Sequence, residues 1–143
     1  CYMADTGLLI SHAFNLKTIM GNELYLKLAL GKLEVNEGML VENVVAQMLK
    51  ASGHELFFYS NNSKYSAEDR MEIDFLVSKP VITNRHNISP IEVKSSNSYT
   101  ITSLNKLRTK FAPMLAESYV LHPADVEVKD GVVYLPLFMA SLL

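Results

Sequence analysis

The sequence predicts an α/β fold, a mixed central β-sheet flanked by helices. Segments that alternate between apolar and polar residues are interleaved with segments whose apolar residues recur at helical spacing. The 143 residues are enough for one compact domain, and 49% of them are hydrophobic, which suits a chain with a buried core. We therefore expect residues 1–143 to form a single domain.

The clearest predicted helix is Glu37–Ala51. Its apolar residues fill one half of the helical circumference, Asn36 is a suitable N-cap, and Gly53 follows the last turn. Near the start of the chain, Asp5-Thr6-Gly7 matches an aspartic-protease triplet, but a strand-to-helix turn capped by Thr6 is the better interpretation in a chain rich in helices. The other predicted helices cover residues 8–14, 22–30 and 103–111.

Strands are expected from alternation and from the turn residues between them. Pro80 and Pro90 bracket a long hairpin connection, and Asp130-Gly131 is a strong signal for a two-residue hairpin turn. The predicted strands cover residues 2–5, 55–60, 72–77, 91–94, 118–121 and 132–135.

Two of these strands carry the residues that point to chemistry. Strict alternation in Glu72–Val77 puts Asp74 on the polar face, with Ile73 and Phe75 on the apolar face. Alternation in Ile91–Lys94 puts Glu92 and Lys94 together. If the strands pair as an antiparallel hairpin, Asp74 lies across from Glu92, with Cβ atoms roughly 4.5–5.5 Å apart.

Two carboxylates at that separation repel each other unless a cation lies between them. Mg²⁺ is a hard cation that commonly uses one or two carboxylates together with water and phosphate oxygens. Lys94 would then orient or help to deprotonate an attacking water, an arrangement that suits phosphodiester hydrolysis. The alternative for Asp74, Glu92 and Lys94 is a solvated sheet face with a surface ion pair.

Ile73-Asp74, followed after a loop by Ile91-Glu92-Val93-Lys94, resembles the D…ExK core of the PD-(D/E)XK nuclease superfamily. Over essentially its whole length, the chain is also similar to the C-terminal domain of unknown function carried by many prokaryotic AAA-type ATPases. The segments that carry this similarity keep their order and are Tyr2–Leu9, Gly38–Asn43, Glu72–Phe75, Ile91–Lys94 and Val133–Leu137.

The resemblance implies a restriction-endonuclease-like core in which Asp74, Glu92 and the Val93 carbonyl bind the metal. It also implies a supporting role for Glu42 and a catalytic role for Lys94. Glu42 falls at the edge of the apolar arc of its helix, where it reaches over the sheet or lies in solvent as a rim glutamate. The chain has Ile-Asp where the motif has Pro-Asp.

A basic helix lies close to this predicted site in the sequence. Lys106 and Lys110 are one turn apart, and Arg108 flanks the apolar side of the same helix. As in related nucleases, such a helix can follow the phosphates of DNA. The alternative is a solvated helix face.

Composition narrows the classes of function. A net charge of −2 argues against a free-standing, histone-like DNA binder. Cys1 is the only cysteine, which excludes a disulfide framework and favours a reducing, cytoplasmic location. The longest nearly apolar stretch, residues 132–143, is shorter than the roughly 20 residues of a membrane span. The four histidines lack zinc-ligand spacing, and no phosphate-binding loop of an ATPase is present.

Two functions stay open. The leading one is Mg²⁺- or Mn²⁺-dependent hydrolysis of DNA, in a C-terminal fragment of a longer protein whose N-terminal ATPase module alone binds ATP. The other is a non-catalytic DNA-binding or protein-docking domain that regulates the attached ATPase. No membrane partner is expected, and a homo-oligomer is compatible with either function.

Overall fold

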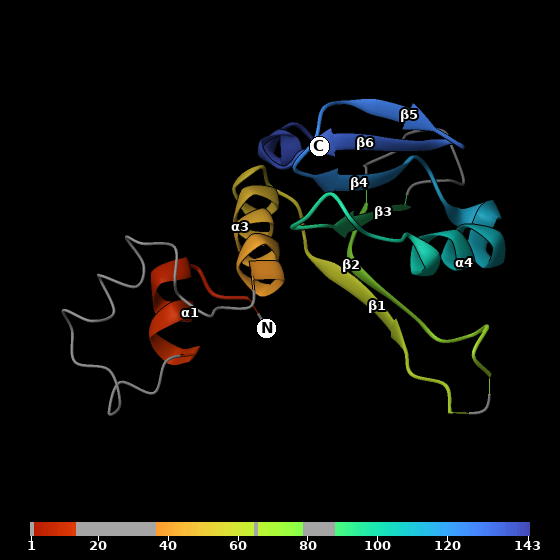
Figure 1. Ribbon diagram of the computed structural model, residues 1–143, viewed down its shortest axis with the longest axis horizontal. Helices are drawn as coiled ribbons and strands as arrows, with labels where there is room; N and C mark the ends of the chain where they lie inside the picture. The colour runs from red at the N-terminus through yellow and green to blue at the C-terminus, as the bar shows by residue number, and fades with distance from the viewer. Residues whose placement is uncertain (1, 14–36, 65, 79–87) are drawn as a thin grey trace.

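The computed structural model describes residues 2–13, 37–64, 66–78 and 88–143, which form an α/β fold around a six-stranded, open, mixed sheet (Figure 1). The strand order is β1-β2-β3-β4-β6-β5. Neighbours β1, β2 and β3 are antiparallel, β3, β4 and β6 run parallel, and β5 pairs antiparallel with β6. The strands are β1 (Phe57–Asn61), β2 (Met71–Ser78), β3 (Ile88–Val93), β4 (Ser118–His122), β5 (Glu127–Lys129) and β6 (Val132–Pro136).

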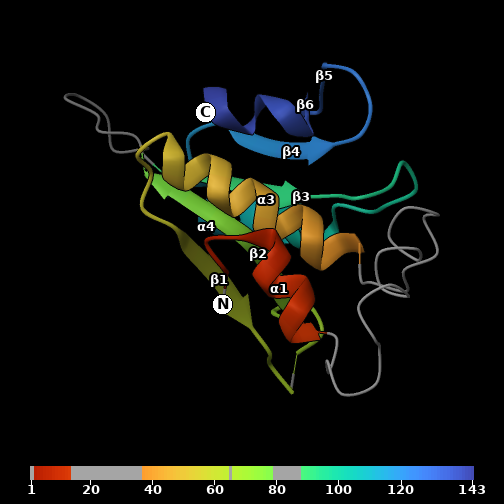
Figure 2. The ribbon, with the colours of Figure 1, turned by 90° about the vertical axis from the view of Figure 1, so that its left-hand side faces the viewer.

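Helices cover both faces of the sheet. Helix α3 (Glu37–Ala51) lies across one face with α1 (Thr6–Ala13) beside it (Figure 2), and the 3₁₀-helix η2 (Leu137–Leu142) packs against α3. Helix α4 (Thr102–Phe111) covers the opposite face and continues into the 3₁₀-helix η1 (Ala112–Met114). Among the described residues, no helix is long and apolar enough to span a membrane. The predicted helix at residues 22–30 lies outside the described residues.

The sheet therefore has a hydrophobic core on each side. Val45 and Leu49 of α3 pack with Phe75 on one side, and Leu104 of α4 packs with Ile73 on the other. All five side chains are at most 1% exposed. Burial of each such side chain contributes about 1.5–3 kcal/mol relative to leaving it in water, so the two cores fix the sheet between the helices.

Two predicted termination signals are confirmed. Helix α3 has the predicted bounds, and Gly53 follows it with a φ of 93° while its amide donates to the Lys50 carbonyl at 3.1 Å. Asp130 and Gly131 have φ values of 51° and 71°, as the tight turn between β5 and β6 requires.

The start of the chain differs from the prediction. Residues 2–5 are not a strand, because the backbone of Met3 bonds to the side chain of Asn43 rather than to a neighbouring strand, with N–H···Oδ1 2.7 Å and C=O···Nδ2 3.1 Å. Helix α1 is capped by Asp5, whose Oδ1 accepts from the Leu8 amide at 2.9 Å, and not by Thr6. The Thr6 hydroxyl accepts instead from Asn43 Nδ2 at 3.2 Å. The turn interpretation holds, with a different cap.

The strict alternation predicted for β2 is wrong at one point. The register pairs β1 and β2 as Phe57 with Leu76 and Tyr59 with Ile73. Asp74 and Phe75 therefore stand together opposite Phe58, which is a β-bulge. The extra residue turns Phe75 to the α3 face while Ile73 packs on the α4 face, so the two do not share a face. The bulge falls at the aspartate of the predicted site.

Candidate active site: an acidic cleft where two strands separate

The candidate site begins where β2 and β3 stop pairing. The last paired residues are Phe75 and Ile91, and the next position of this antiparallel register would pair Asp74 with Glu92. Instead, Oδ2 of Asp74 accepts a hydrogen bond from the backbone amide of Val93 at 2.7 Å. The carboxylate thus takes the place of a backbone acceptor, and Asp74 is held at the point where the two strands separate.

Glu92 joins this point to helix α4. Its side chain is 3% exposed, and Oε1 accepts from the backbone amide of Leu104 at 2.9 Å. Leu104 is in the first turn of α4, where backbone amides lack a helical partner. Ile101, the residue before the helix, supplies no side-chain cap. Oε2 lies 3.0 Å from Nζ of Lys94, with which it forms an ion pair. Glu92 thus uses one oxygen to cap the helix and presents the other to Lys94.

These residues line a cleft of about 340 Å³. Helix α3 contributes Glu42, strands β2 and β3 contribute three further carboxylates, and the only described lysine or arginine in the lining is Lys94. The structure therefore brings together four of the predicted site residues: Glu42, Asp74, Glu92 and Lys94. The complete lining is Glu42, Glu72, Asp74, Glu92, Lys94, Thr100, Thr102 and Ser103.

Three carboxylates of the cleft, those of Asp74, Glu92 and Glu42, are held in unfavourable surroundings for a negative charge. Burial raises the pKa of Asp74, against the opposing effects of the Val93 amide and Lys94. Burial also raises the pKa of Glu92. The ion pair with Lys94 partly offsets this rise, and the negative charge of Asp74 adds to it. The pKa of Glu42 is raised by burial and then by repulsion from Asp74. A bound cation would relieve both the burial cost and the repulsion.

The donor set suits a small metal site rather than a three-carboxylate cage. Among the residues that the structure describes, no three histidine, cysteine or acidic side chains converge closely enough to hold a metal ion. Glu42 therefore lines the cleft without forming one ligand cluster with Asp74 and Glu92. Mg²⁺ is commonly held by one or two carboxylates, with water and phosphate completing its shell. Asp74 and Glu92, with its buried Oε2, fit that smaller requirement.

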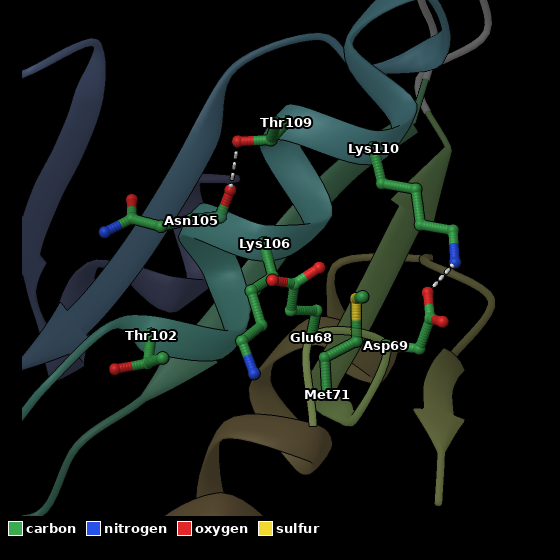
Figure 3. Close-up of a pocket in the computed structure, with 8 residues that line it drawn as sticks. All are labelled: Glu68, Asp69, Met71, Thr102, Asn105, Lys106, Thr109 and Lys110. Atoms are coloured by element: carbon green, nitrogen blue, oxygen red, sulfur yellow. Dashed lines mark hydrogen bonds and ion pairs between the residues drawn. The ribbon is translucent and has the colours of Figure 1, made fainter. Parts of the chain in front are cut away.

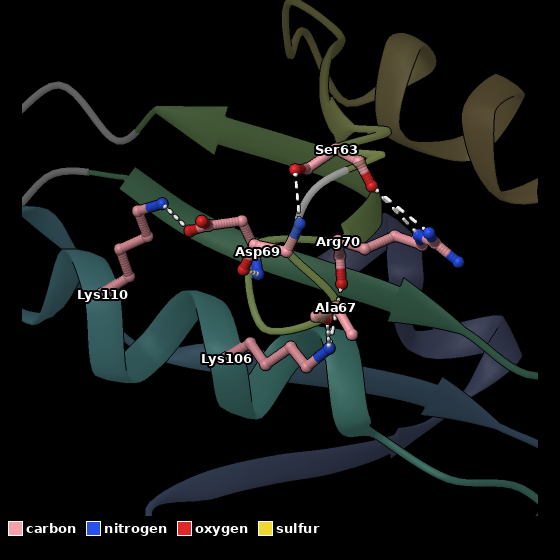
Figure 4. Close-up of polar contacts among 7 residues, drawn as sticks. Ser63, Ala67, Asp69, Arg70, Lys106 and Lys110 are labelled. Carbon is pink, nitrogen blue, oxygen red and sulfur yellow. Dashed lines mark hydrogen bonds and ion pairs between the residues drawn. The ribbon is translucent and has the colours of Figure 1, made fainter.

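The predicted DNA-contacting lysines make contacts within the chain (Figure 4). Nζ of Lys106 donates to the carbonyl oxygens of Ala67 at 2.7 Å and Arg70 at 3.0 Å. Nζ of Lys110 forms an ion pair with Asp69 at 2.5 Å. Both lysines therefore hold the connection between β1 and β2 against α4.

The three basic residues of α4, Lys106, Arg108 and Lys110, do not line the acidic cleft. Lys106 and Lys110 border a separate hollow of about 490 Å³ between α4 and the end of the connection from β1 to β2 (Figure 3). This hollow shares Thr102 with the cleft. Arg108 points to the turn before β6, where its Nη2 donates to the carbonyl of Asp130 at 2.6 Å. A phosphate-binding role for Lys106, Arg108 and Lys110 stays a prediction.

The sequence does not predict two buried polar contacts. Asn43 is 1% exposed and holds the N-terminal segment through Met3. The sequence feature that could have indicated this contact is a polar residue beside the apolar arc of a helix. His122 is 5% exposed, with Nδ1 2.8 Å from the Tyr99 hydroxyl and Nε2 3.0 Å from the Asp125 carbonyl. The imidazole thus anchors the segment between β3 and α4, and no sequence signal linked Tyr99 to His122.

The geometry defines a class: an α/β domain with an open mixed sheet and an acidic, lysine-containing cleft where two antiparallel strands separate. The family model described as "Domain of unknown function (DUF4143)" matches residues 37–139. The chain belongs to this family, and the matched range includes every residue that lines the cleft. No curated protein and no solved structure matches the chain.

Proposed function

We propose that the cleft is a metal-dependent phosphodiesterase centre of the PD-(D/E)XK type that acts on DNA. The observation that carries this proposal is the pair of half-buried Asp74 and buried Glu92, which lines one cleft with Lys94. The order of these residues in the sequence and their place at the separating strands support the likeness to that superfamily.

The chain's own groups suggest how they would act. Asp74 and Glu92 would hold Mg²⁺ or Mn²⁺, with the Val93 carbonyl as a further ligand and Glu42 as a nearby supporting charge. When bound, such a metal polarises a phosphoryl oxygen and stabilises the developing negative charge. The side chain of Lys94 is 24% exposed, so its ammonium group faces both Glu92 and solvent and would orient the attacking water.

The sequence resemblance supports a wider setting for this activity. We place the domain at the C-terminal end of a longer cytoplasmic protein whose ATPase module binds ATP and controls access of DNA to the cleft. The hydroxyls of Thr102 and Ser103 line the cleft at the first turn of α4, where amides and hydroxyls can donate to phosphate oxygens.

A nuclease assay tests the proposal directly. Labelled duplex and single-stranded DNA are incubated with Mg²⁺ or Mn²⁺ and with wild type, Asp74→Ala or Lys94→Ala. We expect each variant to cut at least about 100-fold more slowly, as for loss of one preorganised charge-stabilising group. Lys129→Ala and Asp125→Asn, at exposed positions outside the cleft, serve as matched controls and should cut like wild type. Equal cutting by all five proteins would indicate a contaminant and overturn the proposal.

A non-catalytic docking domain is the second candidate. Two observations favour it. Glu92 already has a structural role as the cap of α4, and Lys106 and Lys110 are engaged in contacts within the chain. Calorimetric titration with Mn²⁺ separates the two. The enzyme requires an ion that wild type binds and Asp74→Asn does not, whereas a docking domain binds its partner equally well in both proteins.

A further inference from the structure

A second hollow of about 390 Å³ continues from the acidic cleft. The two share Glu42, Glu72 and Asp74 in their linings, so they adjoin at these three residues. The character of the walls changes between them, because the second hollow adds aromatic and aliphatic side chains and no described lysine or arginine. Those apolar walls are Tyr2, Leu9, Met39, Phe58 and Ile73.

Phe58 is the most unusual of these walls. It lies in β1, an edge strand of the sheet, directly opposite the bulge that contains Asp74. Its side chain is 72% exposed. A long, exposed apolar strand edge favours aggregation, and a contiguous exposed apolar patch commonly marks a binding surface. Phe58 therefore has the position and the exposure of a ligand contact beside Asp74.

The chemistry of the hollow selects its occupant. Carboxylates repel a phosphate but accept hydrogen bonds from the amino groups of a base, and an aromatic ring stacks on the face of any base. A nucleobase is flat, uncharged and rich in such donors, and the adjoining cleft has the lysine and hydroxyls that suit its phosphate.

We propose that Phe58 is a stacking platform for an unpaired base, so that the substrate is single-stranded nucleic acid or a frayed end. This inference rests on the proposed phosphodiesterase function, because the base would lie next to the phosphate at Asp74. A paired base inside a duplex has both faces covered by its neighbours and cannot stack on Phe58 without leaving the helix.

Binding measurements test the platform without requiring cleavage. Fluorescence anisotropy follows binding of a labelled single strand with phosphorothioate linkages, which resist hydrolysis, to wild type and Phe58→Ala in Mn²⁺. We expect Phe58→Ala to weaken binding about 5- to 100-fold, the value of one base–aromatic stack. Phe58→Trp should bind like wild type and Phe58→Leu like the alanine variant. Phe138→Ala is the matched control, since Phe138 is equally exposed and lies outside the hollow.

A spectroscopic readout distinguishes stacking from a change in fold. A 2-aminopurine base in the strand should lose fluorescence on binding wild type and Phe58→Trp, and keep it with Phe58→Leu. Unchanged affinity in Phe58→Ala, or preference for the matched duplex, overturns the platform even if the nuclease assay succeeds. Failure of cleavage with stacking retained overturns the proposed activity alone. An arginine-rich peptide could instead displace the labelled strand from wild type but not from Phe58→Ala. That result would assign the hollow to an arginine side chain of a protein partner and overturn the inference.

Discussion

Glu92 in β3 caps helix α4 by accepting a hydrogen bond from the Leu104 amide at 2.9 Å. The residue that the sequence assigns to metal binding therefore also ties the sheet to the helix that borders the cleft. The two roles use different atoms, because Oε1 faces the helix while Oε2 faces Lys94. This division predicts that stability and metal binding at Glu92 can be separated by substitution.

Glu92→Ala should destabilise the fold by about 1–3 kcal/mol, because it leaves the buried Leu104 amide without an acceptor. Glu92→Gln keeps an amide oxygen for that bond and should lose less stability, while losing the charge needed to bind a cation. Urea denaturation at pH 7 measures the first effect and Mn²⁺ titration the second. Glu117→Gln, at an exposed position outside the cleft, should change neither. An alanine variant as stable as wild type would show that the cap contributes nothing.

Asp74 should make the protein less stable as the pH rises. Its pKa is raised by burial, so the folded chain keeps a proton that the unfolded chain releases between the ordinary aspartate pKa, about 3.9, and the higher folded value. The stability contributed by this group is present below that window and is lost as the pH rises through the folded pKa.

Comparison with Asp74→Asn isolates this effect, since the asparagine oxygen can still accept from the Val93 amide. The variant should match wild type in acid and have the larger free energy of unfolding at pH 7 in metal-free buffer. Asp69→Asn is a control of opposite sign, because hydrogen bonding to Lys110 lowers the pKa of Asp69. A constant difference between wild type and Asp74→Asn from acid to neutral pH would contradict the prediction.

Local patterns were enough to predict the main elements. The observed bounds of helix α3 are predictable because its apolar arc and Gly53 both act within a few turns of chain, whereas the predicted cap Asn36 lies outside the described residues. The antiparallel pairing of β2 with β3 follows from the expected hairpin connection, although Pro90 lies within β3 opposite Leu76 and does not end the loop. This pairing alone brings Asp74 near Glu92. The core of the candidate site was therefore predictable from two short motifs.

The rest depends on contacts that no local pattern contains. The bulge at Asp74 exists because β1 and β2 pair out of step, which requires knowing the register of both strands. Residues 2–5 are expected as a short strand, but Asn43, about 40 positions away, takes up the hydrogen-bonding groups of Met3. No sequence pattern distinguishes Phe58 from other strand residues, because its place opposite Asp74 and its exposure depend on the register of β1 and β2.

Lys106 provides a last test, because the sequence assigned it to phosphate and the structure gives it two carbonyl partners. Lys106→Met removes the hydrogen bonds to Ala67 and Arg70 while keeping an unbranched apolar stem. We expect faster amide hydrogen exchange in residues 66–70 and no change in the salt dependence of DNA binding, with Lys129→Met unchanged in both. A salt slope lower by about 1 would mean that Lys106 leaves these carbonyls to neutralise a phosphate. In that event the hollow beside α4 belongs to the DNA path, and the loop between β1 and β2 must move when DNA binds.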